Sequence, residues 1–331
     1  MGVSRPILLA LLAAAALIAA TLSLAVGPVP LSPARVLAAL TGGGDEVARI
    51  IVVQIRLPRA ILGLAVGAML GVSGAALQGY LRNPLAEPSV LGASNGAALG
   101  AVTALYFGLA AIHPAALPLL AVAGALLALL LLVLLAGRDA TALSLILAGV
   151  AVGTIAGAGI ALALNLSPNP FAAMEIMTWL MGSLEDRSVQ HVALALPCIA
   201  AGIVLLMWDA RGLDALTLGE DAARSMGVDL SRLRGRLLIG TAVGVGGAVA
   251  VSGAIGFVGL IVPHLVRPLT DRSPSAVLLP SAIGGAALLT LADVAVRLAP
   301  TTGELRLGVV TALLGVPVFL LQLRRERGAW S

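Results

Sequence analysis

The chain has 331 residues, of which 60% are hydrophobic and only 11% are charged. Soluble domains carry about 25% charged residues, so this chain cannot cover a water-facing surface of ordinary size. Its net charge of +4 comes entirely from arginine, and because the sequence contains no lysine it cannot form a P-loop ATP site, which requires one.

Ten apolar segments follow one another along the chain, each approaching the length needed to cross the hydrocarbon core of a bilayer. In chain order they are Pro6–Val26, Ala60–Gly79, Val90–Leu109, Ala115–Ala136, Ala140–Leu164, His191–Trp208, Leu237–Ser252, Ile255–Leu269, Ala276–Leu298 and Leu305–Leu323. The third is rich in glycine and the eighth contains Pro263, so either can be a broken helix buried among its neighbours. The series predicts an all-α polytopic membrane protein in which residues 1–331 form a single transmembrane domain.

Arginine placement sets the expected orientation of these segments. When the N-terminus is placed in the cytoplasm, the inner loops contain more arginines than the outer loops. The positive-inside rule therefore predicts that both termini are cytoplasmic.

Glycines repeat every four residues in three of the segments, which places each set on one helix face. The sets are Gly63, Gly67 and Gly71, then Gly92, Gly96 and Gly100, then Gly149, Gly153 and Gly157. Small residues let the backbones of membrane helices approach closely, so we interpret these faces as packing surfaces.

Two similar strings hint at an internal repeat. Val72–Ala75 and Val251–Ala254 both read Val-Ser-Gly-Ala, and each is followed at the same distance by a proline, Pro84 or Pro263. The predicted spans that contain them run in opposite directions, as in the inverted repeats of many transporters. In a chain so rich in glycine and alanine, chance can also produce such a match.

Three arginines fall at the expected outer ends of spans. Arg56 and Arg59 lie three residues apart, where the second span begins, and therefore share a helix face. They can be interfacial residues with their charges in water, or a docking pair for carboxylates of another protein. Arg297 has the same two interpretations, but Asp293 precedes it by one helical turn and can simply neutralise it.

The polar interval 209–236 is expected on the cytoplasmic side. Leu218, Ala222 and Met226 repeat every four residues on a short predicted helix, and Gly227 supplies a C-terminal stop. The apolar face can lie on the membrane or its own domain, or dock into a groove of a cytoplasmic partner. Three arginines that follow, Arg232, Arg234 and Arg236, are expected to be ordinary anchors at the inner surface.

Several kinds of chemistry lack the residues they need. His113, His191 and His264 are far apart and Cys198 is the single cysteine, so we expect neither a metal site nor a disulfide. No catalytic constellation, cofactor motif or nucleic-acid-binding pattern is present. The rival function is an ion-coupled secondary transporter, but Asp293 is the only carboxylate well within a predicted span, which argues against it.

Several strings in this sequence resemble the FecCD-type permease family, which imports iron–siderophore complexes, haem and vitamin B12. The most specific are Gln54–Arg59, Asn83–Pro88, Leu91–Ala97, Met181–Leu184, Leu218–Glu220, Gly253–His264 and Gly308–Thr311. Their order and spacing extend the resemblance from about Gln54 to Leu323. One departure is Arg306, where the family usually has proline.

The resemblance implies the ten-helix fold of a type II importer of the ATP-binding-cassette (ABC) class, in the bacterial inner (plasma) membrane. It implies a homodimer, with two cytoplasmic ATP-binding subunits below and a periplasmic substrate-binding protein above. The chain itself would then be a permease and not an enzyme. Ferric siderophore is the expected cargo, and cobalamin or haem is the alternative.

The resemblance also implies roles for residues of this chain. Arg56, Arg59 and Arg297 would dock the binding protein. The ATPase-coupling residues would be Leu218, Gly219, Glu220, Ala222, Ala223, Arg224, Met226 and Gly227. The cytoplasmic gate would form where the loop with Asn83 and Leu85 and the loop with Thr141 and Ala142 meet across the dimer, although Asn83 before Pro84 can equally be a turn residue.

Overall fold

The structure is a computed structural model that describes residues 4–137, 140–299 and 305–328, with side chains described up to Leu320. Helices make up its regular structure. They are α1 (Arg5–Ala25), α2 (Pro33–Leu40), α3 (Glu46–Arg49), the π-helical η1 (Ile50–Arg56), α4 (Leu57–Leu81), α5 (Ala93–Tyr106), α6 (Leu109–Ile112), α7 (Ala116–Ala136), α8 (Ala142–Asn165), α9 (Pro170–Leu180), α10 (Val189–Trp208), α11 (Ala210–Leu216), α12 (Glu220–Ser225), α13 (Leu230–Ser252), α14 (Val258–Val266), the 3-10 helix η2 (Arg267–Leu269), α15 (Pro274–Leu298) and α16 (Leu307–Gly328).

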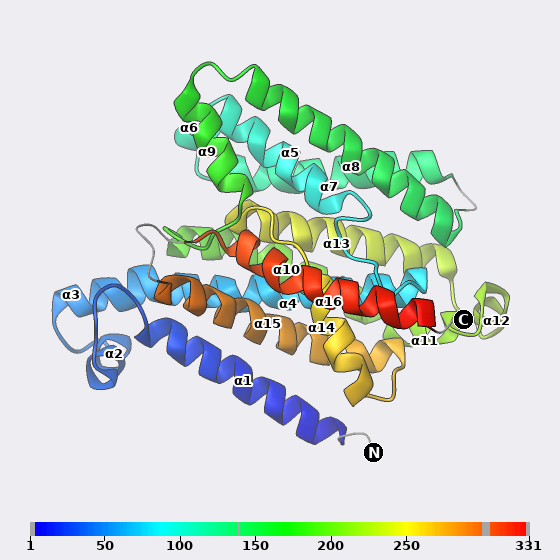
Figure 1. Cartoon of the computed structure of the whole chain (residues 1–331), viewed down its shortest axis with the longest axis horizontal. Coiled ribbons are helices and arrows are strands. Elements are labelled where there is room, and N and C mark those ends of the chain that lie inside the picture. Colours follow the sequence, from blue (N-terminus) through cyan, green and yellow to red (C-terminus); the bar gives the residue numbers. More distant parts are fainter. Residues whose placement is uncertain (1–3, 138–139, 300–304, 329–331) are drawn as a thin grey trace.

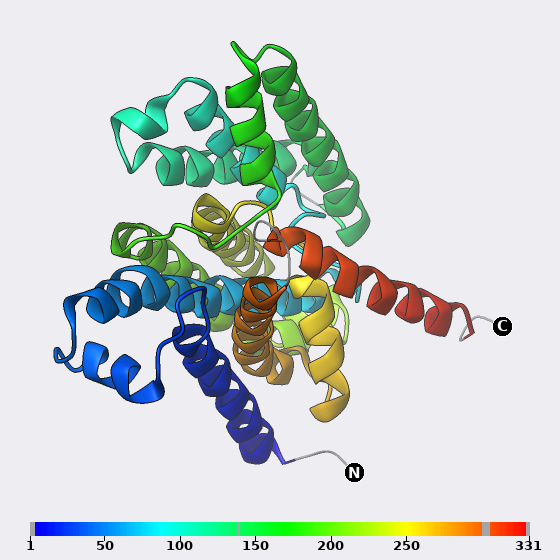
Figure 2. The same ribbon diagram turned by 60° about the vertical axis from the view of Figure 1, so that its left-hand side comes forward.

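Helix α4 lies at the centre of the bundle and packs against α10, α13, α14 and α15 (Figure 1). Figure 2 shows α5 to α9 (cyan to green) gathered on one side and α1, α14 and α15 on the other. The start of α1, the end of α16 and the short helices α11 and α12 all lie at one end of the molecule (Figure 1). Helices α2 and α3 lie at the opposite end. The start of the first helix and the end of the last therefore lie on the same side of the molecule, and the assignment of that side to the cytoplasm stays a prediction.

Seven helices in the described part of the chain are long and apolar enough to cross a membrane. The remaining three predicted segments correspond to α5, α14 and α16. Helix α5 has 14 residues and spans only about 21 Å, less than the hydrocarbon core, and α14 has nine residues. The third and eighth segments are therefore short helices, which was one of the two predicted possibilities.

The second span begins earlier than predicted. A continuous helical stretch runs from Glu46 to Leu81, and its section Ile50–Arg56 has π-helical geometry. The backbone N–H of Leu57 donates to the carbonyl of Val52, five residues earlier. Proline has no N–H and its ring blocks the ordinary helical bond, so a wider turn ahead of Pro58 accommodates it within the helix.

The glycine faces pack as predicted in two of the three sets. A methyl group added at Gly67 would collide with the carbonyl of Gly285 in α15, and one at Gly285 would collide with the carbonyl of Gly67. Gly96 and Gly100 in α5 meet Gly124 in α7 in the same way. These contacts bring backbones together without intervening side chains.

The third set behaves differently. Gly149 in α8 contacts the backbone of Val90, whereas nothing lies within 4 Å of a methyl group added at Gly157.

The close contact at Gly67 leads us to expect that Gly67→Val destabilises the chain by about 1–3 kcal/mol or more through overpacking. The matched control, Gly157→Val, should leave stability nearly unchanged. Thermal unfolding of both purified variants in detergent tests this, and equal midpoints would contradict the packing interpretation.

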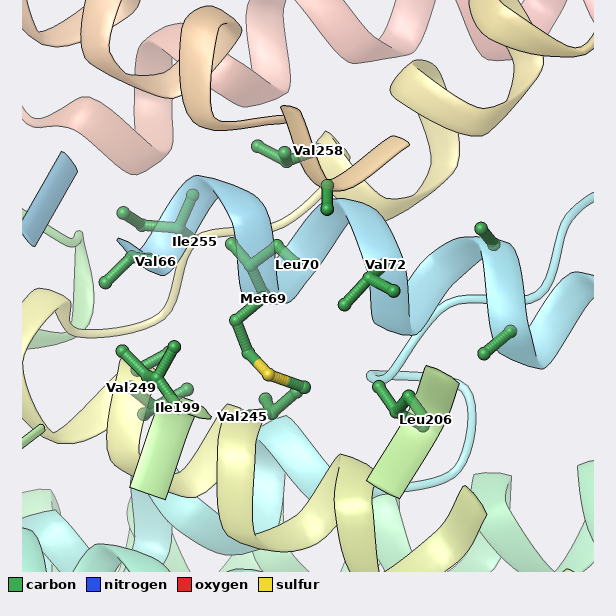
Figure 3. Close-up of a cluster of buried hydrophobic side chains, with 14 of the residues drawn as sticks. Val66, Met69, Leu70, Val72, Ile199, Leu206, Val245, Val249, Ile255 and Val258 are labelled. Atoms are coloured by element: carbon green, nitrogen blue, oxygen red, sulfur yellow. The ribbon is translucent and has the colours of Figure 1, made fainter. Parts of the chain in front are cut away.

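A core of apolar side chains surrounds Met69 on the inner face of α4 (Figure 3). Val245 and Val249 of α13 and Ile199 of α10 face it, and Met69 is fully buried. The flexible thioether of methionine suits such an irregular space between three helices.

The two Val-Ser-Gly-Ala strings occupy different places in the fold. Ser73 and Gly74 lie in the interior of α4, whereas Ser252 ends α13 and Gly253 adopts φ +69° in the loop that follows. The strings are therefore not equivalent positions of a structural repeat, and the inverted-repeat character stays a prediction.

Candidate functional site

The end of the bundle that carries α2 and α3 contains a buried cluster of opposite charges. Arg59 of α4 donates from Nε and Nη2 to the carboxylate of Asp293 in α15, at 2.9–3.0 Å. Arg297, one turn further along α15, forms an ion pair of 3.0 Å with the other side of the same carboxylate. Asp293 is 1% exposed and Arg59 is 7% exposed. One carboxylate therefore lies between two guanidinium groups from two helices.

Arg297 and a third arginine, Arg56, hold the end of α1. Arg297 donates to the carbonyls of Ser23 and Val26 and to the hydroxyl of Ser23, at 2.7–2.9 Å. Arg56 donates to the carbonyls of Leu24, Ala25 and Val29. The last carbonyls of a helix lack intrahelical donors and carry partial negative charge. The guanidinium groups satisfy both needs and attach α1 to α4 and α15.

The sequence-based expectation was that Arg56 and Arg59 point outward from the beginning of a span. The structure instead places both side chains against the chain's own groups, with Arg56 only 3% exposed. The alternative in which Asp293 neutralises Arg297 is confirmed by their ion pair. Sequence reasoning missed the partner of Arg59 because Asp293 is 234 residues away. A docking role for the three arginines stays a prediction.

A polar cavity of about 360 Å³ lies beside this end of the molecule, between α9 and the loop that follows it. Glu175, Trp179 and Arg187 line it, together with Glu185 and Arg306, whose side chains form an ion pair of 3.0 Å. Burial lowers the pKa of Arg187. Arg306 thus attaches the start of α16 to the mouth of the cavity, where the resembled family usually has proline.

The predicted coupling segment forms two short helices at the opposite end. Helix α12 covers only Glu220–Ser225, so Leu218 precedes it and Met226 follows it. Both side chains are exposed, at 69% and 64%, whereas Ala223 is fully buried. An exposed apolar pair at the tip of a segment outside the bilayer is a surface available to a partner.

Glycines lie at both ends of α12, and the predicted stop at Gly227 is confirmed. Gly219 (φ +103°) precedes α12 and Gly227 (φ +85°) ends it, with the N–H of Val228 donating to the carbonyl of Ala223. This is the hydrogen bond of a glycine-terminated helix.

Glu220 and Arg224 form an exposed i,i+4 ion pair at 3.7 Å, which contributes little to stability. Ala222 is half-buried between them. These two charged side chains therefore remain accessible to a partner from solution.

Helix α11 anchors the coupling segment to the transmembrane helices. The Asp214 carboxylate accepts a 2.8 Å hydrogen bond from the backbone N–H of Ser275 at the start of α15. Arg236 of α13 pairs with Asp209, and its guanidinium lies 5.8 Å from the ring centre of Trp208. Arg236 was expected to be a simple surface anchor, and it instead links α13 to the end of α10.

The four predicted gate residues lie in two segments on one apolar cluster. The Asn83 side chain accepts a hydrogen bond of 2.9 Å from the N–H of Leu85, which confirms the turn interpretation of Asn83. The Thr141 hydroxyl caps α8 by accepting from the N–H of Ser144, and Ala142 begins that helix. The structure thus brings both segments together on one apolar cluster, formed by Leu77, Leu81, Ala86, Leu91, Ala128, Leu132, Ala140, Leu145, Ala148, Val152 and Leu238.

Sequence reasoning missed a carboxylate at the break before α14. Glu87 accepts hydrogen bonds from the N–H of Phe257 (3.2 Å) and from the hydroxyl of Ser89. Phe257 is the N-terminal cap residue of α14 and adopts φ +67°. A carboxylate at a helix N-terminus accepts hydrogen bonds from free N–H groups and interacts favourably with the helix dipole. The 170-residue separation between Glu87 and Phe257 explains why no local pattern indicated this contact.

Comparisons with known proteins agree with this architecture. The FecCD transport family model matches residues 15–325. The chain is 41% identical over 302 residues to an uncharacterised ABC transporter permease, YvrB, of Bacillus subtilis, a match that covers 88% of this chain and 83% of the relative. It is 43% identical over 275 residues to the vitamin B12 import permease BtuC of Vibrio cholerae, with 82% of each chain covered.

An archaeal relative and a solved structure extend the match. The cobalamin import permease BtuC of Halobacterium salinarum is 41% identical over 293 residues, covering 87% of this chain and 77% of the relative. A solved structure described as a metal-chelate type ABC transporter in an inward-facing conformation superposes with a TM-score of 0.86. It is 30% identical and covers 97% of this chain and 99% of its own. The chain therefore belongs to the FecCD transport family and is the permease subunit of an ABC importer, in which a partner subunit hydrolyses ATP.

Proposed function

We propose that the cargo of this importer is a corrinoid of the vitamin B12 class. The observation that carries the proposal is the identity of 41–43% with permeases named for vitamin B12 or cobalamin import, across more than four fifths of this chain. The ferric siderophore expected from the sequence becomes the second candidate, since the similar solved structure is described as of the metal-chelate type.

The permease works with a partner ATPase and a binding protein. We propose that two copies of the permease assemble with two copies of the ATPase. Two helices support a dimer because they expose apolar side chains that the chain itself leaves uncovered. These are Leu147, Ile155 and Leu162 of α8 and Leu313, Leu314 and Leu320 of α16, each at least 51% exposed. A path through the membrane that is lined by such apolar side chains would suit a large cargo, because it offers few polar contacts to hold the cargo.

The cytoplasmic end is proposed to be the one that carries α11, α12, the start of α1 and the end of α16. Leu218 and Met226, which flank α12, would enter a groove of the ATPase, since exposed apolar side chains around a short helix can dock in this way. The gate segments at Asn83, Leu85, Thr141 and Ala142 lie at the same end as α12 (Figure 1). ATP-driven motion of the ATPase would thus be applied close to the gate.

The opposite end is proposed to face the binding protein. Arg56, Arg59 and Arg297 bring three positive charges there, and the carboxylate of Asp293 pairs with Arg59 and Arg297, whereas Arg56 donates to backbone carbonyls. The surplus of positive charge favours approach of acidic side chains from a partner. Because the guanidinium groups already have partners, docking carboxylates would have to share or exchange those bonds.

Uptake by the reconstituted importer tests the proposed cargo. The chain, its partner ATPase and its binding protein are placed in liposomes, and uptake of labelled cobalamin, a ferric siderophore and haem is measured with ATP inside. We expect ATP-dependent uptake of cobalamin. Uptake of the siderophore alone would replace the cargo assignment. Uptake driven by an imposed ion gradient without ATP would instead support the ion-coupled alternative and reject the importer.

A further inference from the structure

Arg234 bridges three separate parts of the chain near the cytoplasmic end. It lies on the second turn of α13, and its Nε donates to the hydroxyl of Tyr80 at 3.1 Å. Its Nη2 donates to the carbonyl of Ala140 at 3.4 Å. One guanidinium group thus connects the start of α13, the end of α4 and Ala140, the residue before the N-terminal cap of α8. Sequence reasoning treated it as a surface anchor, whereas the side chain is half-buried.

Tyr80 and Ala140 each lie shortly before a gate segment. Tyr80 is two residues from the residue that ends α4 in the left-handed conformation, Arg82, and the turn of Asn83 follows. Ala140 immediately precedes Thr141, which caps α8. A displacement of Arg234 would therefore be transmitted to the first residue of each segment, through one hydrogen bond in each case.

The apolar surroundings make this connection stiff. Leu238 lies four residues after Arg234 and so shares its face of α13. Leu238 and Ala140 belong to one buried cluster, and Tyr80 packs against it. Packed interiors transmit small shifts because they are dense and have few alternative arrangements. The polar bridge and the apolar cluster thus hold the same three elements together.

The other end of this connection is the coupling segment. Helix α12 ends at Ser225, α13 begins at Leu230, and the two helices contact each other. Asp229 caps α13 by accepting from the N–H of Arg232, which fixes the angle at which the segment enters the helix. Any tilt of α12 imposed by a partner is therefore applied to the first two turns of α13, where Arg234 lies.

We propose that Arg234 is the positioning residue that couples movement of the α12 segment to both halves of the cytoplasmic gate. This inference rests on the proposed coupling and gating roles of those segments. Arginine suits the task because its planar fork can hold a hydroxyl and a carbonyl in two directions at once, whereas lysine offers a single point charge. The hydroxyl of Tyr80 makes the bond specific, since phenylalanine would fill the same space without accepting it.

The test compares Arg234→Met and Tyr80→Phe in the complete importer, reconstituted with its ATPase and binding protein. Two quantities are measured: cobalamin molecules taken up per ATP hydrolysed, and cross-linking between two copies of the chain through Thr141→Cys in a Cys198→Ser background. We expect ATP hydrolysis to continue in both variants while uptake per ATP falls about fivefold or more. Cross-linking should lose its dependence on ATP. The double variant should be no worse than Arg234→Met alone, because the bond that Tyr80→Phe removes is already lost in Arg234→Met.

Arg272→Met is the matched control, since Arg272 is an exposed arginine in the loop before α15, outside the coupling and gate segments. Its uptake per ATP should equal that of the unmodified chain. If both test variants keep the unmodified ratio and ATP-dependent cross-linking, the inference is wrong while the proposed function stands. If Arg234→Met does not fold, Tyr80→Phe decides alone. ATP-independent uptake by the unmodified chain would overturn both.

Discussion

Replacing Asp293 with alanine is expected to unfold or severely destabilise the permease. Its carboxylate is 1% exposed and pairs with Arg59 and Arg297, so its removal leaves two guanidinium groups buried without their counter-charge. Breaking a buried ion pair by removing one partner typically costs about 3–5 kcal/mol. Since Arg297 also holds the end of α1 through Ser23 and Val26, we expect that helix to detach first.

Thermal unfolding of the purified chain in detergent measures the effect. Asp293→Asn keeps the volume but not the charge, so it should also be strongly destabilising. Asp45→Asn is the matched control, because Asp45 pairs with Arg35 in an exposed ion pair at the same end of the molecule. Such a pair contributes about 1 kcal/mol or less. Equal midpoints for Asp293→Ala and the control would contradict the structural role of the cluster.

A triple substitution separates charge from packing. Changing Arg59 and Arg297 to methionine together with Asp293 to leucine removes all three charges and keeps most of the volume. Replacing a buried ion network with apolar residues is often neutral or stabilising, so this variant should fold better than Asp293→Ala. If such a stable variant lost only its response to the binding protein, the docking prediction for the arginines would gain direct support.

Local patterns predicted the helical elements but not the contacts between distant ones. Hydropathy and glycine spacing identified α4 and the face of Gly67, because membrane thickness and close helix approach act on consecutive residues. The start of the same helix was placed too late, at Ala60, since a hydropathy pattern does not reveal that a π-helical turn carries the helix past Pro58.

The charged contacts were less predictable for a related reason. Arg59 and Asp293 meet across 234 residues, and Glu87 meets Phe257 across 170. Helix packing creates both pairs, and no periodicity in a single sequence encodes which helices are neighbours. The i,i+4 pair of Asp293 and Arg297 was accessible to sequence reasoning, because a single helix fixes its geometry.

The second large effect is expected at the coupling segment, at the proposed cytoplasmic end. Leu218→Glu combined with Met226→Glu should abolish ATP-driven uptake while leaving the chain folded. Both side chains are more than 60% exposed, so the charges remain in water when the permease is alone. Burying a leucine or methionine in a partner groove contributes about 1.5–3 kcal/mol per side chain. Losing both contacts should therefore weaken ATPase binding by a factor of about 100 or more, since 1.4 kcal/mol corresponds to tenfold.

Co-purification of the ATPase with the tagged permease measures this binding, and uptake in liposomes measures its consequence. Leu37→Glu is the control, because Leu37 is 63% exposed on α2 at the opposite end of the molecule. It should retain the ATPase. If the double variant also retained the ATPase and transported normally, the exposed pair would be a membrane-surface contact, and the coupling contact would have to be sought among Glu220, Arg224 and their neighbours. The apolar side chains at the two ends are about equally exposed, so exposure does not reveal which surface binds the ATPase. Comparing the double variant with Leu37→Glu decides it.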